Sequence, residues 1–186
     1  MSKAGNRICP VEKAGSLDHR LRRWFQNPRK ILGPHLHKGM VALDFGCGPG
    51  FFSVEMAQMV GPSGRVIACD LQDGMLRKLG AKIQGTPFEM QIRIHQCEAR
   101  AIGWSGHVDF ILAFYVLHEL PDQRAVFQEM ASILKPEGRI LVVEPPFHVS
   151  RAAFEETLAI AHRSGLMRVE QPRVFLSKAA LLRKTT

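Results

Sequence analysis

Three glycines alternate with other residues in the segment 44–50, which reads Asp-Phe-Gly-Cys-Gly-Pro-Gly. Glycines at this spacing let the backbone pass close to a ligand, because no Cβ stands in the way. The dinucleotide fingerprint G-x-G-x-x-G is not met, since Phe51 stands where its last glycine would open a helix. Asp44 would also repel a pyrophosphate, whereas its carboxylate suits a ligand with an ammonium or sulfonium charge. A tight turn with no ligand is the structural alternative.

A second carboxylate, Asp70, follows the next β-rich run and stands 20 residues beyond Gly50. An acidic residue at the end of the second strand of a doubly wound sheet accepts hydrogen bonds from ribose hydroxyls. A nucleoside that carries positive charge in place of phosphates fits both carboxylates. S-adenosylmethionine is such a molecule, and it is the cofactor that we expect.

Short apolar runs and helical patterns alternate along the chain and would place these carboxylates at one edge of a sheet. Asp73 is expected to cap the second helix, and Leu120-Pro121-Asp122 to begin the third. The expected strands are 40–45, 65–69, 91–96, 108–114, 139–143, 167–171 and 174–182. The expected helices are 51–60, 73–84, 122–134 and 151–164, with a turn at 135–138.

This order predicts an α/β fold with a doubly wound, mostly parallel, seven-stranded sheet covered on both sides. The last two strands have no helix between them, so they should pair antiparallel. Ligands bind such sheets at the carboxyl ends of the strands, near the point where the strand order reverses. The glycine segment lies between the first strand and the first helix, which is that place.

The amino-terminal segment has a helical pattern of its own. Leu17, Leu21, Trp24 and Phe25 share one apolar face, and the opposite face carries basic residues, Arg20, Arg22 and Arg23. The Asn27-Pro28 step should break this helix. We interpret residues 1–39 as a helical lid segment and residues 40–186 as the ligand-binding domain; a basic solvated face over a packed stripe is the alternative.

The net charge of +8 is uneven along the 186 residues. Residues 1–40 carry +7 and residues 151–186 carry +4, whereas residues 41–150 carry −3. The regular middle of the chain is therefore slightly acidic, which argues against a nucleic-acid partner. The first thirty residues lack a secretory apolar stretch and no apolar run reaches the ~20 residues of a membrane span, so we expect a cytoplasmic protein. The cysteines show no metal-ligand spacing, and no metal is expected.

The ordered motifs resemble class I S-adenosylmethionine-dependent methyltransferases, and within them the ubiquinone/menaquinone-biosynthesis-like group, often labelled type 11. The resemblance covers roughly residues 40–186 and implies the Rossmann-like methyltransferase fold. Its motifs are Val41-Ala-Leu-Asp-Phe-Gly-Cys-Gly-Pro-Gly50, Val66-Ile-Ala-Cys-Asp70, Gln96-Cys-Glu98-Ala99, the run from Val108 to Asp122, and Leu134-Lys-Pro-Glu-Gly-Arg-Ile-Leu-Val-Val143.

The resemblance also implies roles for individual residues toward the cofactor. Gly46, Gly48 and Gly50 would line its methionine part, with Asp44 near the loop and the amino group. Asp70 would hold the ribose, Leu71 would pack on adenine, and Glu98 with Ala99 would read the adenine edge. Glu98 departs from the commoner Asp at that place. Phe114 and Tyr115 would face the reactive end, and Cys47 is interpreted as a small loop residue.

Methyl transfer to a hydroxyl or carbon acid also requires removal of a proton. The candidate bases are His118, Glu119, Glu144 and His148. We choose His118 because histidine titrates nearest to neutral pH, with Tyr115 as a second catalytic candidate. In the structural alternative, His118 and Glu119 only begin a helix and Glu144 only satisfies buried amides.

The sequence therefore predicts an enzyme that methylates a small-molecule acceptor, whose identity it does not give. Two alternatives stay open at this stage: an RNA methyltransferase, and a noncatalytic S-adenosylmethionine-binding partner protein. Amino-methylating enzymes on nucleic acids carry an Asn/Asp-Pro-Pro-Tyr/Phe tetrapeptide after the fourth strand, where this chain has Ala113-Phe-Tyr-Val116. The similar Glu144-Pro-Pro-Phe147 follows the fifth strand instead.

Overall fold

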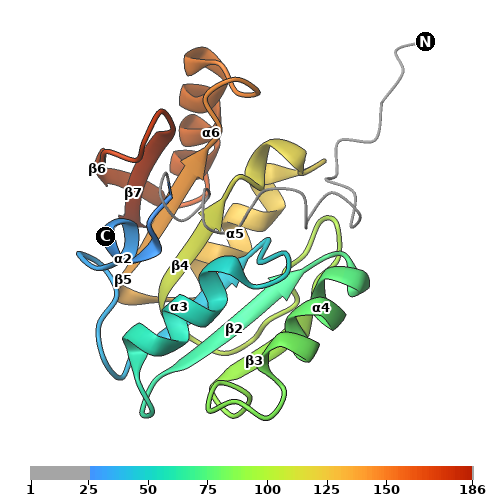
Figure 1. The fold of residues 1–186 in the computed structure, drawn as a ribbon. Helices are drawn as coiled ribbons and strands as arrows, with labels where there is room; N and C mark the ends of the chain where they lie inside the picture. Colours follow the sequence, from blue (N-terminus) through green and yellow to red (C-terminus); the bar gives the residue numbers. More distant parts are fainter. Residues whose placement is uncertain (1–25, 186) are drawn as a thin grey trace.

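The computed structural model describes residues 26–185, which form one mixed sheet between two layers of helices (Figure 1). The strands are β1 Val41–Phe45, β2 Arg65–Asp70, β3 Ile92–Gln96, β4 Val108–Phe114, β5 Leu134–Glu144, β6 Leu166–Glu170 and β7 Lys178–Lys184. The helices are α2 Pro28–Leu32, α3 Phe51–Val60, α4 Asp73–Ile83, η2 Leu117–Glu119, α5 Gln123–Ile133 and α6 Arg151–Arg163.

The seven strands lie in the order β3-β2-β1-β4-β5-β7-β6. The strands from β3 to β5 are parallel, and β7 runs antiparallel to both of its neighbours, β5 and β6. The predicted fold class is therefore confirmed, including the antiparallel last strand. The order reverses between β1 and β4, so the carboxyl ends of these two strands define the switch point at which ligands bind in open α/β sheets.

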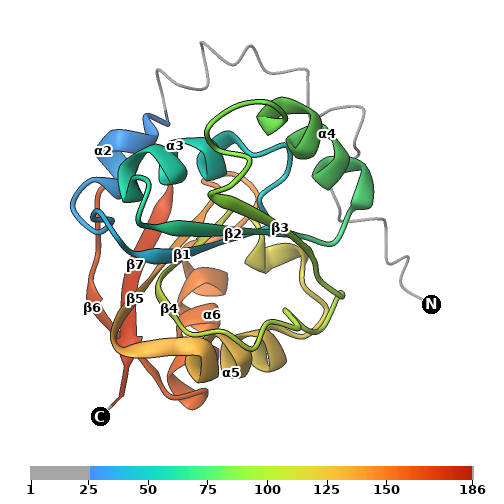
Figure 2. The same cartoon turned by 90° about the horizontal axis from the view of Figure 1, so that it is seen from below.

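Helices cover both faces of the sheet, with α2, α3 and α4 on one side and α5 and α6 on the other (Figure 2). Successive residues of β1 alternate between these two layers. Leu43 and Phe45 pack in the cluster that contains α5 and α6, whereas Ala42 packs with α3 and α4. Because both faces are covered, the central strands are apolar throughout rather than alternating.

Three sequence predictions of local structure are wrong. Residues 135–138 are expected to form a turn, but they lie within β5. In the pairing with β4, Val108 lies opposite Leu134 and Phe110 opposite Arg139. The residues of β5 between these two pairs form an irregularity in the register. Asp73 was expected to cap α4, but the N-cap is Gln72 and Asp73 is the first helical residue, paired with Arg77.

The third wrong boundary is that of the last strand, which begins at Lys178 rather than at residue 174. The Ser177 N–H donates to the Val174 carbonyl at 2.9 Å, so residues 174–177 form a turn in place of the start of the strand.

The amino-terminal helix expected around residues 17–25 lies outside the described residues. The Asn27-Pro28 step, expected to end that helix, begins another one: the Asn27 side chain accepts the Arg29 and Lys30 N–H groups and caps α2. Leu32 and Leu36 are buried in the core beside α3. Among the helices that the structure describes, none has the length and hydrophobicity needed to cross a bilayer.

Candidate functional site

The glycine segment forms the connection between β1 and α3 at the switch point of the sheet. Gly46, Gly48 and Gly50 all have φ between +53° and +77°, a backbone conformation that is strained for any residue with a side chain. A Cβ on Gly46 would lie 2.6 Å from Val116 Cγ2, and a Cβ on Gly50 would meet Leu79. A Cβ on Gly48 would meet no protein atom within 4 Å. Gly46 and Gly50 thus serve packing, whereas Gly48 presents bare backbone outward.

Asp70 holds this loop directly. The parallel pairing of β1 with β2 brings the ends of the two strands together, with Phe45 opposite Cys69. Asp70 Oδ2 accepts the Gly48 N–H at 2.8 Å, and Oδ1 accepts the Gln72 N–H at 2.8 Å. The residue is only 8% exposed. Its carboxylate therefore lies beside the bare backbone of Gly48, with one further lone pair on each oxygen for a ligand hydroxyl.

Asp44 lies near the end of β1, directly before the loop. It is 2% exposed, and its Oδ2 accepts the Ser53 hydroxyl of α3 at 2.6 Å. This bond joins the end of β1 to the first turns of α3 and fixes the ends of the glycine segment. The carboxylate still places negative charge beside the loop, where the low dielectric strengthens its attraction for a cationic ligand. Sequence reasoning missed Ser53, because no local pattern pairs it with Asp44.

The remaining adenosine candidates lie at the ends of β2 and β3. The Cys97 N–H donates to the Asp70 carbonyl, and Glu98 exchanges backbone hydrogen bonds with Ala101. Glu98 and Ala99 are exposed, and Leu71 is half-buried against the core. The structure thus brings Leu71, Glu98 and Ala99 to the same edge of the sheet as Asp70.

Two cysteines near this edge, Cys47 and Cys69, are buried and do not have the character of nucleophiles. Burial raises the pKa of Cys47, and the neighbouring carboxylates Asp44 and Asp70 raise it further. A hydrogen bond with Cys97 raises the pKa of Cys69, and burial adds to that effect. Because the thiolate is the reactive form, Cys47 is a poor nucleophile, and its interpretation as a small loop residue stays a prediction.

The other half of the site follows β4. Phe114 is buried, and its ring lies 4.5 Å from Phe52 and 4.3 Å from Tyr115, centroid to centroid. Tyr115 has φ +58°, so the chain turns sharply at the end of the strand. Its hydroxyl shares a 2.6 Å hydrogen bond with Ser177 Oγ and accepts the Gln26 amide at 3.0 Å. Neither partner of Tyr115 was identified from the sequence, since each is far along the chain.

His118 and Glu144 form a pair after β4 and at the end of β5, in which the glutamate is buried and the histidine is partly exposed. The Glu144 side chain is 1% exposed; its Oε1 accepts the N–H groups of Leu117 at 3.0 Å and His118 at 3.3 Å. Its Oε2 accepts His118 Nδ1 at 2.5 Å. This hydrogen bond raises the pKa of His118, against the lowering effect of burial. Glu144 therefore does satisfy buried amides, as the structural alternative held, and it also orients the imidazole.

A cavity of about 470 Å³ adjoins this pair, between the start of α5 and α6. His118 and His148 both line it, together with apolar side chains such as Leu120 and Ile160. Among the candidate bases, His118 and His148 therefore line one cavity. Glu144 does not line it, but it is hydrogen-bonded to His118. The described residues include no cluster of three or more His, Cys, Asp or Glu side chains arranged to hold a metal ion.

The comparison with known families agrees with this geometry. A family model described as a methyltransferase domain matches residues 36–171, which is more than half of the chain. The chain belongs to the methyltransferase domain family. Together with the relatives and solved structures described next, this match confirms the predicted resemblance to class I S-adenosylmethionine-dependent methyltransferases and, at the level of the family, the predicted cofactor.

Two curated relatives of this methyltransferase domain are quinone-pathway enzymes. The demethylmenaquinone methyltransferase of Lactobacillus johnsonii is 33% identical over 107 residues, which is 57% of this chain and 44% of the relative. The ubiquinone/menaquinone biosynthesis C-methyltransferase UbiE of Pasteurella multocida is 32% identical over 110 residues, which is 59% of this chain and 41% of the relative. The chain thus spans less than half the length of these relatives.

Two solved structures share the fold of the methyltransferase domain. An S-adenosylmethionine-dependent methyltransferase from Aquifex aeolicus superposes with a TM-score of 0.83 at 23% identity, over 96% of this chain and all of the other. A TehB-like methyltransferase from Corynebacterium glutamicum gives a TM-score of 0.74 at 15% identity, over 95% of this chain and all of the other. At these identities the likeness shows the fold alone.

Proposed function

We propose that this chain transfers the methyl group of S-adenosylmethionine to a small-molecule acceptor. One observation carries the proposal: at the switch point of the sheet, a glycine loop held by Asp70 lies on one side and the His118–Glu144 pair on the other. The first half has the chemistry to bind a cationic nucleoside. The second half has the chemistry to take a proton.

The residues present fit this cofactor. Because Gly48 has no side chain, a ligand can approach its backbone closely. Asp70 adds an acceptor for ribose hydroxyls beside it. Leu71, Glu98 and Ala99 would hold the adenine, Gly46 and Gly50 would shape the loop, and Asp44 would supply negative charge beside it. When bound, S-adenosylmethionine supplies a methyl group on a positively charged sulfur, already activated for transfer.

Proton removal from the acceptor is assigned to His118. Because the Glu144 carboxylate accepts the Nδ1 proton, the lone pair of the neutral imidazole lies on Nε2. Glu144 is a positioning residue: it fixes the tautomer and stabilises the imidazolium that forms when the proton is taken. Phe114 and Tyr115 would enclose the reactive end and exclude water, with Tyr115 held by Ser177.

The cavity beside His118 favours a small acceptor with an acidic hydroxyl or carbon acid. Its volume of about 470 Å³ is in the range of small-molecule sites. The relatives named as demethylmenaquinone methyltransferases make a reduced quinone the first acceptor to try. An RNA acceptor finds less support, since Glu144 of the tetrapeptide-like 144–147 run is engaged by His118 and Phe147 is exposed.

The segment 1–39 is proposed to act as a lid, as the sequence predicted. Support comes from Gln26, whose amide donates to the Tyr115 hydroxyl at 3.0 Å and brings the chain before α2 to the reactive end of the site. Leu32 and Leu36 belong to the core, so α2 and the residues that follow it are fixed parts of the fold.

The test is production of S-adenosylhomocysteine by the purified chain with a panel of reduced quinones, phenols and short RNAs. We expect turnover with a small acidic acceptor and a kcat/KM that rises with pH as His118 loses its proton, with a midpoint above the ordinary 6.5. His118→Asn should reduce kcat by about a hundredfold or more, the usual contribution of a positioned base. The exposed His107→Asn is the control.

The two alternatives make opposite predictions in this panel. Turnover with RNA alone, with affinity that falls steeply with salt, would assign the chain to nucleic-acid methylation. Cofactor binding without turnover on any acceptor would make it a noncatalytic binding partner. Either result contradicts the proposal.

A further inference from the structure

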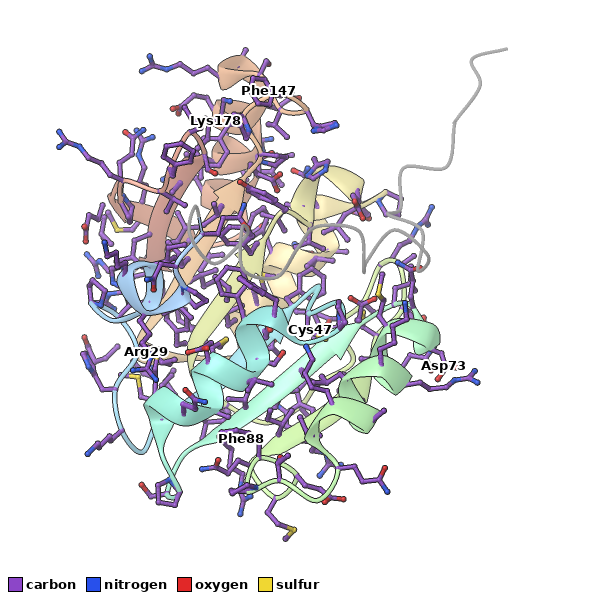
Figure 3. The ribbon with its side chains drawn as sticks, viewed as in Figure 1. Arg29, Cys47, Asp73, Phe88, Phe147 and Lys178 are labelled. Atoms are coloured by element: carbon purple, nitrogen blue, oxygen red, sulfur yellow. The ribbon has the colours of Figure 1, made fainter. Side chains whose placement is uncertain are left out.

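Three large apolar side chains stand exposed at the end of the sheet where β5 ends and β7 begins. Phe147 is 88% exposed, Leu176 65% and Phe175 55%. They belong to the connection between β5 and α6, residues 145–150, and the connection between β6 and β7, residues 171–177, which we call the paired loops. Glu144 pairs with Lys178 in the sheet, and Lys178 Nζ donates to the Pro146 carbonyl at 3.3 Å, so the two loops lie side by side. Figure 3 shows Phe147 and Lys178 together at one end and Phe88 at the other.

The second loop holds its apolar side chains outward in a strained turn. The Ser177 N–H donates to the Val174 carbonyl, so Phe175 and Leu176 are the central residues of the turn, and Val174 is its buried anchor. Leu176 has φ +52°, a conformation for which glycine or asparagine is preferred. A leucine there adds strain, although 65% of it stays exposed. A contact outside the chain would explain this choice of residue.

Basic residues outnumber acidic ones at the paired loops. Arg173 and His148 lie within them and Arg151 and Lys178 follow them directly, whereas the buried Glu144 and the exposed Glu170 precede them. Arg151 and Arg173 are exposed. Apolar side chains at loop tips with basic residues around them are the two signals that together hold a protein at an anionic lipid surface.

We propose that the paired loops dock on an anionic lipid bilayer, with Phe147 and Leu176 inserted among the headgroups and the basic residues against the phosphates. A protein groove would accept the apolar tips equally well but does not account for the excess of positive charge around them. The docking surface is separate from the cofactor loop, so the inference does not depend on the proposed reaction. It places the catalytic end of the sheet toward the membrane, because both loops adjoin Glu144 and Tyr115 through the sheet pairing and Ser177.

The experiment is flotation of the full chain with vesicles of phosphatidylcholine and with vesicles in which a third of it is replaced by phosphatidylglycerol. We expect binding to the anionic vesicles and little to the neutral ones. Phe147→Ser and Leu176→Asn should each weaken binding about tenfold, since each removes most of one inserted apolar side chain without changing the charge. Raising the salt should weaken the remaining binding, by about fivefold for each basic residue whose attraction to the headgroups is screened.

The control is Met90→Ser, at the opposite end of the molecule. Met90 is 81% exposed and lines a cavity with Phe88 there, so its loss should leave vesicle binding unchanged. Leu176→Asn also separates docking from folding, because asparagine tolerates the φ of this position and should keep or raise the melting temperature while lowering vesicle binding. No binding to anionic vesicles, or equal binding by all variants, would overturn the proposal. So would Phe147-dependent dimers in solution, which would assign the surface to a second copy.

Discussion

The substitution Asp70→Asn tests the proposed ribose contact with almost no change of shape. Asp70 accepts two loop amides, from Gly48 and Gln72, and keeps one lone pair on each oxygen for a ligand hydroxyl. Asparagine preserves one carbonyl oxygen and replaces the other with an NH₂ group. That group cannot accept a hydrogen bond, so one loop amide and one ligand hydroxyl are both left without an acceptor.

The expected magnitudes follow from the burial of the carboxylate. A hydrogen bond to a charged group contributes about 1.5–3 kcal/mol, and at 8% exposure water competes little for it. At 1.4 kcal/mol for each factor of ten, the Kd for S-adenosylmethionine should rise about 10- to 150-fold. The loop amide left without an acceptor should lower the free energy of unfolding by about 1–3 kcal/mol, which is a fall of about 2–10 °C in Tm.

Calorimetric titration with S-adenosylhomocysteine and with its 2′-deoxy analogue separates the ribose contact from a disturbed loop. In the parent chain, removal of the hydroxyl should weaken binding; in Asp70→Asn, the two ligands should bind nearly alike. Asp73→Asn is the matched control, because Asp73 is exposed and its ion pair is with Arg77 on its own helix. A Kd for the variant within about threefold of the parent value, or a hydroxyl effect that persists in the variant, would refute the ribose contact.

Three further predictions concern the loop and the His118–Glu144 pair. Gly48→Ala should weaken cofactor binding in calorimetry. It should lower the free energy of unfolding by only about 1–2 kcal/mol, the left-handed backbone penalty, because no protein atom lies near the new Cβ. Unchanged binding would contradict the proposed contact of Gly48 with the cofactor. Ser53→Ala should lower the free energy of unfolding in urea by about 1–3 kcal/mol, since it removes a hydrogen bond to buried Asp44, and an unchanged midpoint would count against that bond. Because the pKa of His118 is raised in the fold, its charged pair with Glu144 stabilises the protein fully below about pH 6.5 and less as the pH rises through the folded pKa. The difference in unfolding free energy between the parent and Glu144→Gln should therefore shrink from about pH 6 to about pH 9. A constant difference would show that the charge plays no part.

The sequence predicted the sheet and the meeting of the glycine loop with Asp70 because their signals are local. Helix α3 and strand β4 have the bounds expected from their periodicity, and Asp70 ends β2 beside the glycine loop as its spacing implied. In parallel strands, residues at equivalent ends meet at one edge, so the chain order alone brings the glycine loop and Asp70 together. The misplaced turn at 135–138 shows the limit: Pro and Gly favoured a turn, but pairing with β4 absorbed those residues into β5.

Only the tertiary structure decided which residues, far apart in the chain, meet across the sheet. His118 was chosen from the sequence as a base, but its dependence on Glu144 follows from the adjacency of β4 and β5. Ser177 reaches Tyr115, and the paired loops come together, because β7 inserts antiparallel beside β5 rather than at the edge of the sheet. No periodicity in the sequence encodes which strand becomes a neighbour, since that depends on the burial gained by the whole sheet. The sequence by itself thus determined the fold class and the place of the glycine loop, whereas contacts across strands determined the His118–Glu144 pair and the exposed apolar end.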